Sequence, residues 1–229
     1  MSLIEIKDVS KAYFNRPALN HVNLNLNSGK IIGLCGPNGS GKTTLLKIMV
    51  RLLRDYRGHI QIDGQPLGPE ALASVSYLPD QTYFEKQMKG TESIAVFKDM
   101  YPDFDEGVMY SLLEQLDVNA NDRFQEMSKG MQEKFQLALV MSRKAKVYLL
   151  DEPIGGVDPA SRDKILRTIL STYGEDSLLL ISTHLIQDIE SILDEVIFLK
   201  EGQVYLHENC DDLRERTGKS VDQHFREVF

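Results

Sequence analysis

A glycine-rich segment has the residue types and spacing of a loop that binds phosphate groups. Residues 36–43, GPNGSGKT, fit the pattern G-x-x-x-x-G-K-[ST] without a mismatch, after an apolar run at 31–35 and before a helical run. The glycines let the backbone curl so that several N–H groups point at one anion, and the helix behind them adds a favourable dipole. The Lys42 ammonium can reach the β- and γ-phosphates of a nucleotide, and the Thr43 hydroxyl can ligate Mg²⁺.

The plainer alternative for this segment is a glycine turn that caps a helix. The strand before it and the helix after it make that alternative weak, because the phosphate-binding motif requires this context. Lys42 also counts as a catalytic residue, since it contacts the phosphate that is transferred. The nucleotide-binding residues that the motif predicts are Gly36, Pro37, Asn38, Gly39, Ser40, Gly41, Lys42, Thr43 and Thr44.

Two adjacent carboxylates follow an apolar run at 147–150. Asp151 would emerge at the C-terminal end of a buried strand, where open α/β sheets hold their ligands, and it could help to bind Mg²⁺. The side chain of Glu152 points differently on an extended backbone, so it could face the attacking water as a general base. An ordinary acidic pair at a strand end is the alternative, which the phosphate loop upstream makes improbable.

The elements that must position these groups can be read from hydrophobic periodicity. Residues 22–26 alternate as a half-buried antiparallel strand does, whereas 31–35 are continuously apolar. A helical pattern covers about 91–144, and the last third alternates short strands with helices, which is typical of a parallel sheet. We therefore predict an α/β fold with a parallel-sheet core, an antiparallel β subdomain and an inserted helical subdomain.

This pattern divides one domain, 1–229, into a core with its β subdomain at 1–90 and 146–207 and a helical subdomain at 91–145. Residues 208–229 form a polar tail with weak helical character. The chain of 229 residues is long enough to bury a substantial core as one such domain.

Composition excludes several classes of protein. The net charge of −8 argues against nucleic-acid binding, which favours a basic surface. Two cysteines do not make a disulfide framework. We expect no signal peptide, because charged residues interrupt the first eleven positions. Apolar runs are strand-length, far short of the roughly 20 residues of a membrane-spanning helix, so we expect a soluble chain whose membrane role comes through a partner.

With its motifs in this order, the chain resembles the ATP-binding subunits of ABC transporters from about Leu3 to Leu206. The resemblance implies the P-loop NTPase fold of ABC ATPases. It places Tyr13 where an aromatic ring stacks on adenine, with Phe14 as the rival. Asp158 matches the D-loop aspartate, although Asp158 before a proline also fits a helix N-cap. His184, at the end of a predicted strand, matches the switch histidine that contacts the γ-phosphate.

Residues 127–131, MSKGM, align with the family's LSGGQ signature, although spacing alone predicts only a helix capped by Ser128. The resemblance implies that Ser128, Lys129 and Gly130 bind the γ-phosphate of another subunit's ATP. Lys129 replaces a glycine, and its positive charge is compatible with phosphate. The "SKGM" form resembles bacterial exporter ATPases that serve ABC-2-type permeases.

At the position of the family's Q-loop glutamine stands Asp80, followed by Gln81, and we predict Asp80 first and Gln81 second as Mg²⁺ ligands.

The resemblance thus implies an ATPase that uses ATP and Mg²⁺, with Glu152, His184 and Lys42 as catalytic residues. Its expected partners are a second ATPase subunit, in a homodimer or a heterodimer, and an integral membrane permease that faces about 82–90. The expected location is cytoplasmic, peripheral on the inner face of the cell membrane. The alternatives are an ABC ATPase without a transport role and a weakly catalytic regulatory subunit. The transported substrate is read by the permease and is not encoded here.

Overall fold

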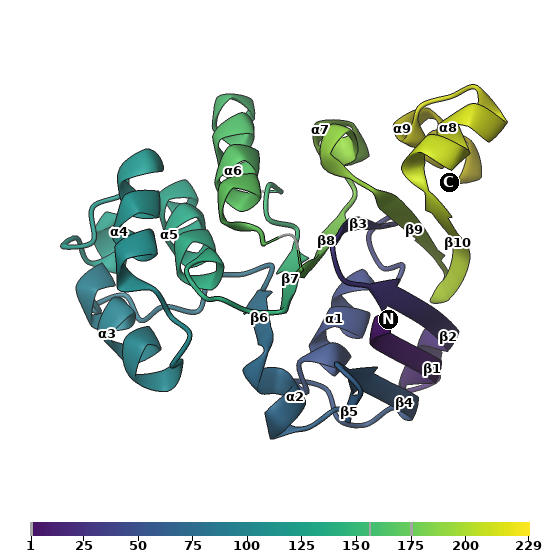
Figure 1. Cartoon of the computed structure of the whole chain (residues 1–229), viewed down its shortest axis with the longest axis horizontal. Coiled ribbons are helices and arrows are strands. Elements are labelled where there is room, and N and C mark those ends of the chain that lie inside the picture. Colours follow the sequence, from purple (N-terminus) through teal and green to yellow (C-terminus); the bar gives the residue numbers. More distant parts are fainter. Residues whose placement is uncertain (1, 156, 175) are drawn as a thin grey trace.

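The computed structural model describes residues 2–155, 157–174 and 176–229, and its core is a six-stranded sheet (Figure 1). The strand order is β10-β9-β3-β8-β7-β6; neighbouring strands from β9 to β6 run parallel, and β10 pairs antiparallel with β9. The strands are β3 (Lys30–Cys35), β6 (Val75–Leu78), β7 (Val147–Asp151), β8 (Leu178–Thr183), β9 (Glu195–Lys200) and β10 (Gln203–Asn209). The predicted α/β fold with a parallel core is confirmed.

A second, antiparallel sheet has the order β2-β1-β4-β5. Its strands are β1 (Ser2–Tyr13), β2 (Arg16–Asn27), β4 (Arg57–Ile62) and β5 (Gln65–Pro66). In β2 the alternation is as predicted, because Val22, Leu24 and Leu26 are buried and the residues between them are exposed. Helix α1 (Lys42–Met49) contributes Leu45 and Leu46 to one buried cluster that both sheets share. This packing fixes the start of α1, and hence the phosphate loop, between the two sheets.

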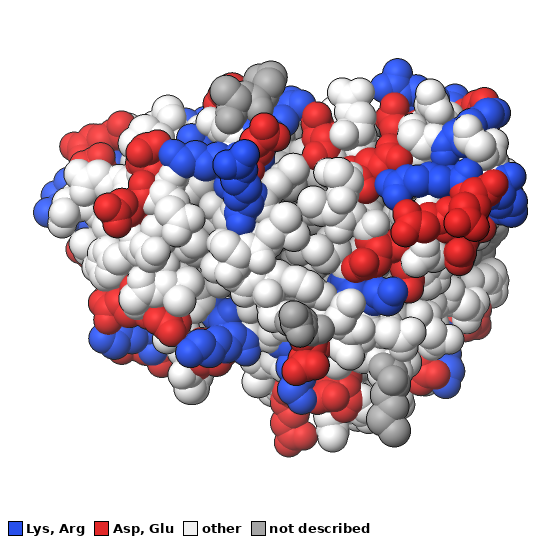
Figure 2. Space-filling view, turned by 45° about the horizontal axis from the view of Figure 1, so that its top comes forward, with Lys and Arg blue, Asp and Glu red and all other residues white. Residues whose placement is uncertain are grey.

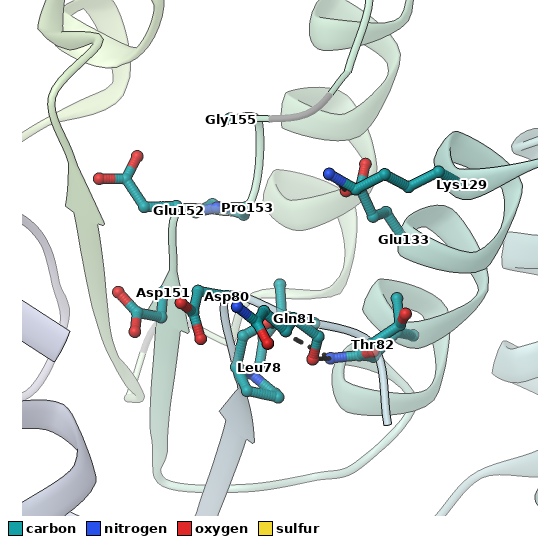
Figure 3. A pocket seen from close by; sticks show the side chains of 12 residues that line it. Leu78, Asp80, Gln81, Thr82, Lys129, Glu133, Asp151, Glu152, Pro153 and Gly155 are labelled. Carbon is teal, nitrogen blue, oxygen red and sulfur yellow. Dashed lines mark hydrogen bonds and ion pairs between the residues drawn. The ribbon is translucent and has the colours of Figure 1, made fainter. Parts of the chain in front are cut away.

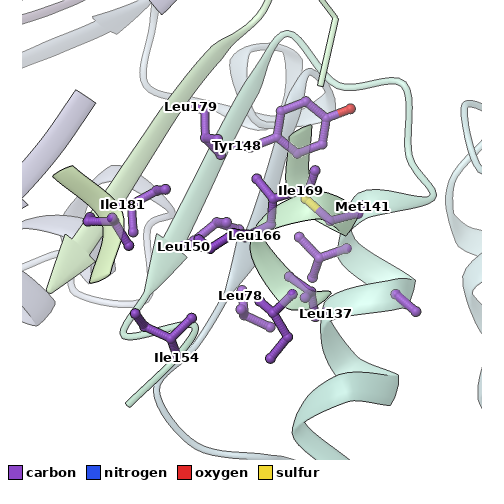
Figure 4. Close-up of a cluster of buried hydrophobic side chains, with 14 of the residues drawn as sticks. Leu78, Leu137, Met141, Tyr148, Leu150, Ile154, Leu166, Ile169, Leu179 and Ile181 are labelled. Carbon is purple, nitrogen blue, oxygen red and sulfur yellow. The ribbon is translucent and has the colours of Figure 1, made fainter. Parts of the chain in front are cut away.

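The insertion between β6 and β7 is helical. It contains α3 (Gly90–Met100), α4 (Glu106–Gln115), the 3₁₀ turn η1 (Phe124–Glu126) and α5 (Lys129–Met141). The short helix α2 (Pro69–Ala73) precedes β6 and lies outside the insertion. In Figure 4, Leu137 and Met141 of α5 pack with Leu150 of β7 and with Leu166 and Ile169, which lie on α6 (Pro159–Thr172). The buried side of α5 thus ties the insertion to the core.

The tail at 208–229, expected to be polar and weakly helical, contains the end of β10 and the helices α8 (Cys210–Thr217) and α9 (Val221–Val228). They pack beside α7 (Ile186–Ile189), the turn η2 (Glu190–Ile192) and β9. The Glu190 carboxylate accepts hydrogen bonds from the N–H groups of Val221, at 2.9 Å, and Asp222, at 3.2 Å. The Phe225 ring lies 5.3 Å from that of Phe198. An acidic group at a helix start and aromatic packing therefore hold α9 in place.

In the described part of the chain, no helix has the length and apolar character needed to cross a membrane.

Arg143 joins the insertion to the core from a nearly buried position, with 4% of its surface exposed. Its guanidinium donates to the carbonyls of Val75, at 2.5 Å, and Ala73, at 2.7 Å, on the core side. On the insertion side it forms two 3.0 Å bonds to the Asp103 carboxylate and stacks 3.9 Å from the centre of the Tyr101 ring. A planar five-donor group suits such a multiple contact, and lysine would not replace it.

We expect Arg143→Met to destabilise the protein by about 3 kcal/mol, because it leaves a carboxylate and two carbonyls without their buried partner. Urea unfolding measures the change. The matched control is Lys98→Met, which removes an exposed ion pair with Glu106 and should leave the midpoint almost unchanged. Equal midpoints for the two variants would contradict the bridging role of Arg143.

Candidate functional site

The phosphate loop runs from the end of β3 into α1 with two residues in the left-handed region. Gly39 has φ 83° and Gly41 has φ 108°. A Cβ atom on Gly41 would lie 2.5 Å from the carbonyl oxygen of Ala18, so both its conformation and its surroundings require glycine. The loop therefore has the tight curl that turns successive N–H groups toward one point.

Lys42 lies inside this loop, with 5% of its surface exposed. Its ammonium donates to the carbonyls of Gly36, at 2.7 Å, and Pro37, at 3.3 Å, and lies 3.6 Å from Oε1 of Glu152. An anion bound by the loop N–H groups would lie next to the positive charge of the Lys42 ammonium.

A cavity of about 370 Å³ opens over the loop. It is lined by residues 38–44 together with Tyr13, Ala18, Asp80 and Glu152. A neighbouring hollow of about 590 Å³ is lined by residues 13–18 and Gly39. Tyr13 borders both spaces, whereas Phe14 borders only the second and is fully exposed in a turn with φ 54°. Of the two aromatic candidates, Tyr13 is the one that reaches the loop cavity.

Asp151 ends β7 with only 1% of its surface exposed. Its Oδ1 accepts from the Thr43 hydroxyl at 3.2 Å and from the Ser182 hydroxyl, and its Oδ2 is buried without a hydrogen-bond partner among the described residues. Burial raises the pKa of this carboxyl group, and the carboxylates of Asp80 and Glu152 add to the effect. A buried carboxylate oxygen with no donor, next to a threonine hydroxyl, suits a hard cation such as Mg²⁺.

Sequence reasoning did not identify Ser182. It faces Asp151 across the parallel pair of β7 and β8. The available signal is a serine directly after the apolar run at 178–181. Pairing that serine with Asp151 requires the register of two strands, because the two residues are 31 positions apart in the chain.

Glu152 turns away from Asp151 because its backbone has φ 51°, which is unusual for a residue with a side chain. Its N–H donates to the Ser182 hydroxyl at 3.1 Å. Its carboxylate lies between the Lys42 ammonium and the His184 ring, whose Nδ1 is 3.0 Å from Oε2. The predicted residues Lys42, Glu152 and His184 thus form one cluster beside the loop cavity.

Asp80 and Gln81 lie in the segment after β6, and their side chains point to different places. Figure 3 shows the Asp80 carboxylate beside that of Asp151, with Gln81 on the far side. Asp80 lines the loop cavity, and its Oδ1 lies 4.0 Å from the Lys47 ammonium. The Gln81 carbonyl instead accepts a long bond of 3.5 Å from the Gln136 amide. The geometry favours Asp80 over Gln81, and the metal-binding role of either residue stays a prediction.

Ser128 is the N-cap of α5, since its hydroxyl accepts from the N–H of Met131 at 3.2 Å. The Lys129 side chain is 81% exposed and its ammonium lies 3.6 Å from the Glu133 carboxylate. It borders a second cavity of about 230 Å³, shared with Asp80 and Glu152 (Figure 3). A Cβ on Gly130 would meet nothing within 4 Å among the described residues. The first turn of α5 is therefore accessible on the side of Gly130, and none of its residues lines the loop cavity.

Asp158 caps the next helix. Its carboxylate accepts from the N–H of Ser161 at 3.1 Å at the start of α6. The local prediction of an N-cap followed by proline is confirmed, while contact between Asp158 and a second subunit stays a prediction.

Comparison with known proteins finds one family over most of the matched sequence. The model of the family described as ABC transporter matches residues 19–155. The chain is 29% identical over 216 residues to the ABC transporter ATP-binding protein YtrB of Bacillus subtilis, covering 93% of this chain and 74% of that protein. It is 28% identical over 211 residues to the lantibiotic transport ATP-binding protein SrtF of Streptococcus pyogenes, covering 91% and 92%. A solved structure of an ATP-binding subunit of an ABC transporter aligns over 99% of both chains with a TM-score of 0.88 and 26% identity.

Proposed function

The chain belongs to the ABC transporter family, and we propose that it is the ATP-hydrolysing subunit of an exporter whose permease is a separate membrane protein. The observation that carries this proposal is the cluster at the phosphate loop. There the Glu152 carboxylate lies between Lys42 and His184, beside the buried Asp151–Thr43 pair. A relative of similar length is named for lantibiotic transport, which supports a role in transport.

Each residue of the cluster has a role in hydrolysis. The loop N–H groups and Lys42 hold the phosphates, and Tyr13 stacks on the adenine. Thr43 and Asp151, with Asp80 beside them, would hold Mg²⁺, which neutralises charge on the phosphate oxygens.

Glu152 accepts a proton from the water that attacks the γ-phosphorus, and ADP leaves. His184 orients Glu152 through their 3.0 Å contact and faces the γ-phosphate.

The open face of α5 supports a second half-site. Ser128, Lys129, Gly130 and Asp158 lie outside the lining of the loop cavity, in the described part of the chain. Two subunits, identical or related, would sandwich two ATP molecules, each bound by the loop of one chain and the first turn of α5 of the other. ATP then stabilises the closed dimer because it contacts both surfaces, and hydrolysis removes that difference in affinity.

A largely apolar groove of about 760 Å³ supports the permease contact. It lies between α1, α2 and β6 on one side and α3 on the other. Leu52 and Met100 are each 63% exposed on its walls, and such exposed apolar side chains are typical of protein interfaces. We place a segment of the membrane permease here, which would hold the chain on the inner face of the cell membrane. The same groove reaches Asp80, so occupancy could act on the nucleotide site.

The rival functions have less support. Figure 2 shows lysine and arginine interspersed with acidic residues around a broad uncharged area, without a continuous basic stripe on that face. This distribution of charges and the net charge of −8 do not favour an ATPase that acts on nucleic acid. The close grouping of Lys42, Glu152 and His184 argues against a weakly catalytic subunit.

Replacing the proposed general base tests the mechanism. Glu152→Gln should lower ATP turnover by about 100-fold or more while ATP binding persists, because the amide cannot accept the proton of water. The variant should accumulate as an ATP-bound dimer, measured by light scattering after size exclusion. Turnover at the wild-type rate would remove Glu152 from this role.

A charge reversal on α5 tests the half-site. Lys129→Glu should lower turnover of the dimer by about tenfold, because it places a negative charge beside the triphosphate of the other subunit. Binding of ATP to the monomer should not change, since Lys129 does not line the loop cavity. The control is Lys98→Glu on α3. Equal turnover in the two variants would remove Lys129 from the site.

Charges in the groove test the permease contact. Leu52→Glu and Met100→Glu should reduce several-fold the fraction of the chain that sediments with membranes of its source cells, because a buried, unpaired carboxylate disfavours docking. ATP turnover of the purified chain should remain. Leu170→Glu, at an apolar residue on α6 that is 41% exposed and outside the groove, is the control. If all three variants sediment like the wild type, the groove is not the contact.

A further inference from the structure

Arg162, one turn into α6, contacts two segments that follow different strands of the sheet, namely the loop after β7 and the helix α7 after β8. Its Nη1 donates to Oδ2 of Asp188 at 2.6 Å, and its Nε donates to the carbonyl of Val157 at 3.3 Å. The side chains of Arg162 and Asp188 are only 22% and 20% exposed. We call this pair of contacts the Arg162 bridge.

Val157 and Asp188 lie close in the chain to residues with proposed roles in the ATPase cycle. Val157 is followed directly by Asp158, on the loop that continues from β7. Asp188 lies in α7, which begins two residues after His184 at the end of β8. The turn between them is short and tied, because the Leu185 N–H donates to the Thr183 hydroxyl at 2.9 Å. His184 and Asp188 are therefore joined by one short, hydrogen-bonded segment.

Helix α6 gives the bridge a firm base. Its inward residues Ile165 and Ile169 are 1% and 0% exposed in the large core cluster, and Figure 1 shows α6 and α7 next to each other above the sheet. A guanidinium is planar and rigid, so it can hold two acceptors at a fixed separation where a lysine ammonium could hold only one firmly. Partial burial keeps the ion pair from being screened as a surface pair is.

We propose that Arg162 is a positioning residue that couples the two ATP sites of the dimer. Through Asp188 it senses the segment that follows His184, which faces the ATP of its own chain. Through the Val157 carbonyl it sets the loop that presents Asp158 to the other chain. ATP in one site then stabilises the loop position that closes the dimer, which is a coupling between two binding events. This inference rests on the ATP sandwich proposed above.

The bridge is tested in the Glu152→Gln background by measuring the ATP concentration that gives half-maximal dimer in light scattering. Adding Arg162→Met should raise that concentration by about fivefold to tenfold, the size of effect expected for one link in a coupled network. Binding of ATP to the dilute monomer should be unchanged, because Arg162 does not line the loop cavity. A residue with a merely structural role would change the thermal midpoint and leave the dimerisation threshold at the parent value.

Three further variants keep the test decisive. Asp188→Asn removes the ion pair without changing shape and should reproduce the effect even where Arg162→Met folds poorly. Arg162→Lys keeps the charge near Asp188 but releases Val157, and it should be intermediate. The matched control is Lys164→Met on the same helix, which breaks an ion pair of 2.5 Å with Asp117 and touches neither loop.

The outcomes separate the inference from its premise. If the Glu152→Gln parent does not dimerise with ATP, the sandwich is wrong and the bridge falls with it. If the parent dimerises and Arg162→Met and Asp188→Asn share its threshold, the sandwich stands and the Arg162 bridge is overturned. A threshold raised equally by Lys164→Met would also overturn it, because the effect would belong to α6 in general.

Discussion

A carboxylate buried at the end of an apolar strand is the constraint on which the rest of the site depends. Asp151 has lost nearly all its hydration, and burying a charge is costly unless donors or a cation compensate for it. The compensating hydroxyls come from Thr43 at the start of α1 and from Ser182 on β8. The phosphate loop, β7 and β8 must therefore keep one relative position. The Oδ2 atom of Asp151 has no hydrogen-bond partner among the described residues, and it is the oxygen that a cation would compensate.

The backbone at Glu152 gives two neighbouring carboxylates different surroundings. Its positive φ turns the chain sharply, so Asp151 stays under Thr43 while Glu152 reaches the Lys42 ammonium and the His184 ring. Such strain persists only where surrounding contacts hold it, and here the Glu152 N–H is held by Ser182. One serine thus supports both acidic residues, and a single turn separates the proposed cation site from the proposed base.

Besides its apolar packing, the helical insertion has two polar connections to the core that contrast in strength. At the end of α5, Arg143 makes short charged contacts to both parts. At the segment after β6, Gln136 of α5 donates only long bonds, of 3.4 Å to Pro79 and 3.5 Å to Gln81. The weaker connection carries Asp80, which borders both the nucleotide cavity and the apolar groove. A partner in the groove would therefore act on the looser end of the insertion, next to the site.

The features that could be predicted from the sequence are those that depend on local interactions. The glycines of 36–43, the Ser128 and Asp158 caps and the alternation in β2 follow from backbone freedom, nearby N–H groups and side-chain period. Tertiary structure alone decided that Ser182 supports Asp151, that Asp80 lies nearer the loop than Gln81, and that Arg143 and Arg162 bridge distant segments. It also decided that the polar tail docks through Glu190 and Phe198. These contacts join residues far apart in the chain, so they depend on strand register and helix packing, which no local pattern encodes.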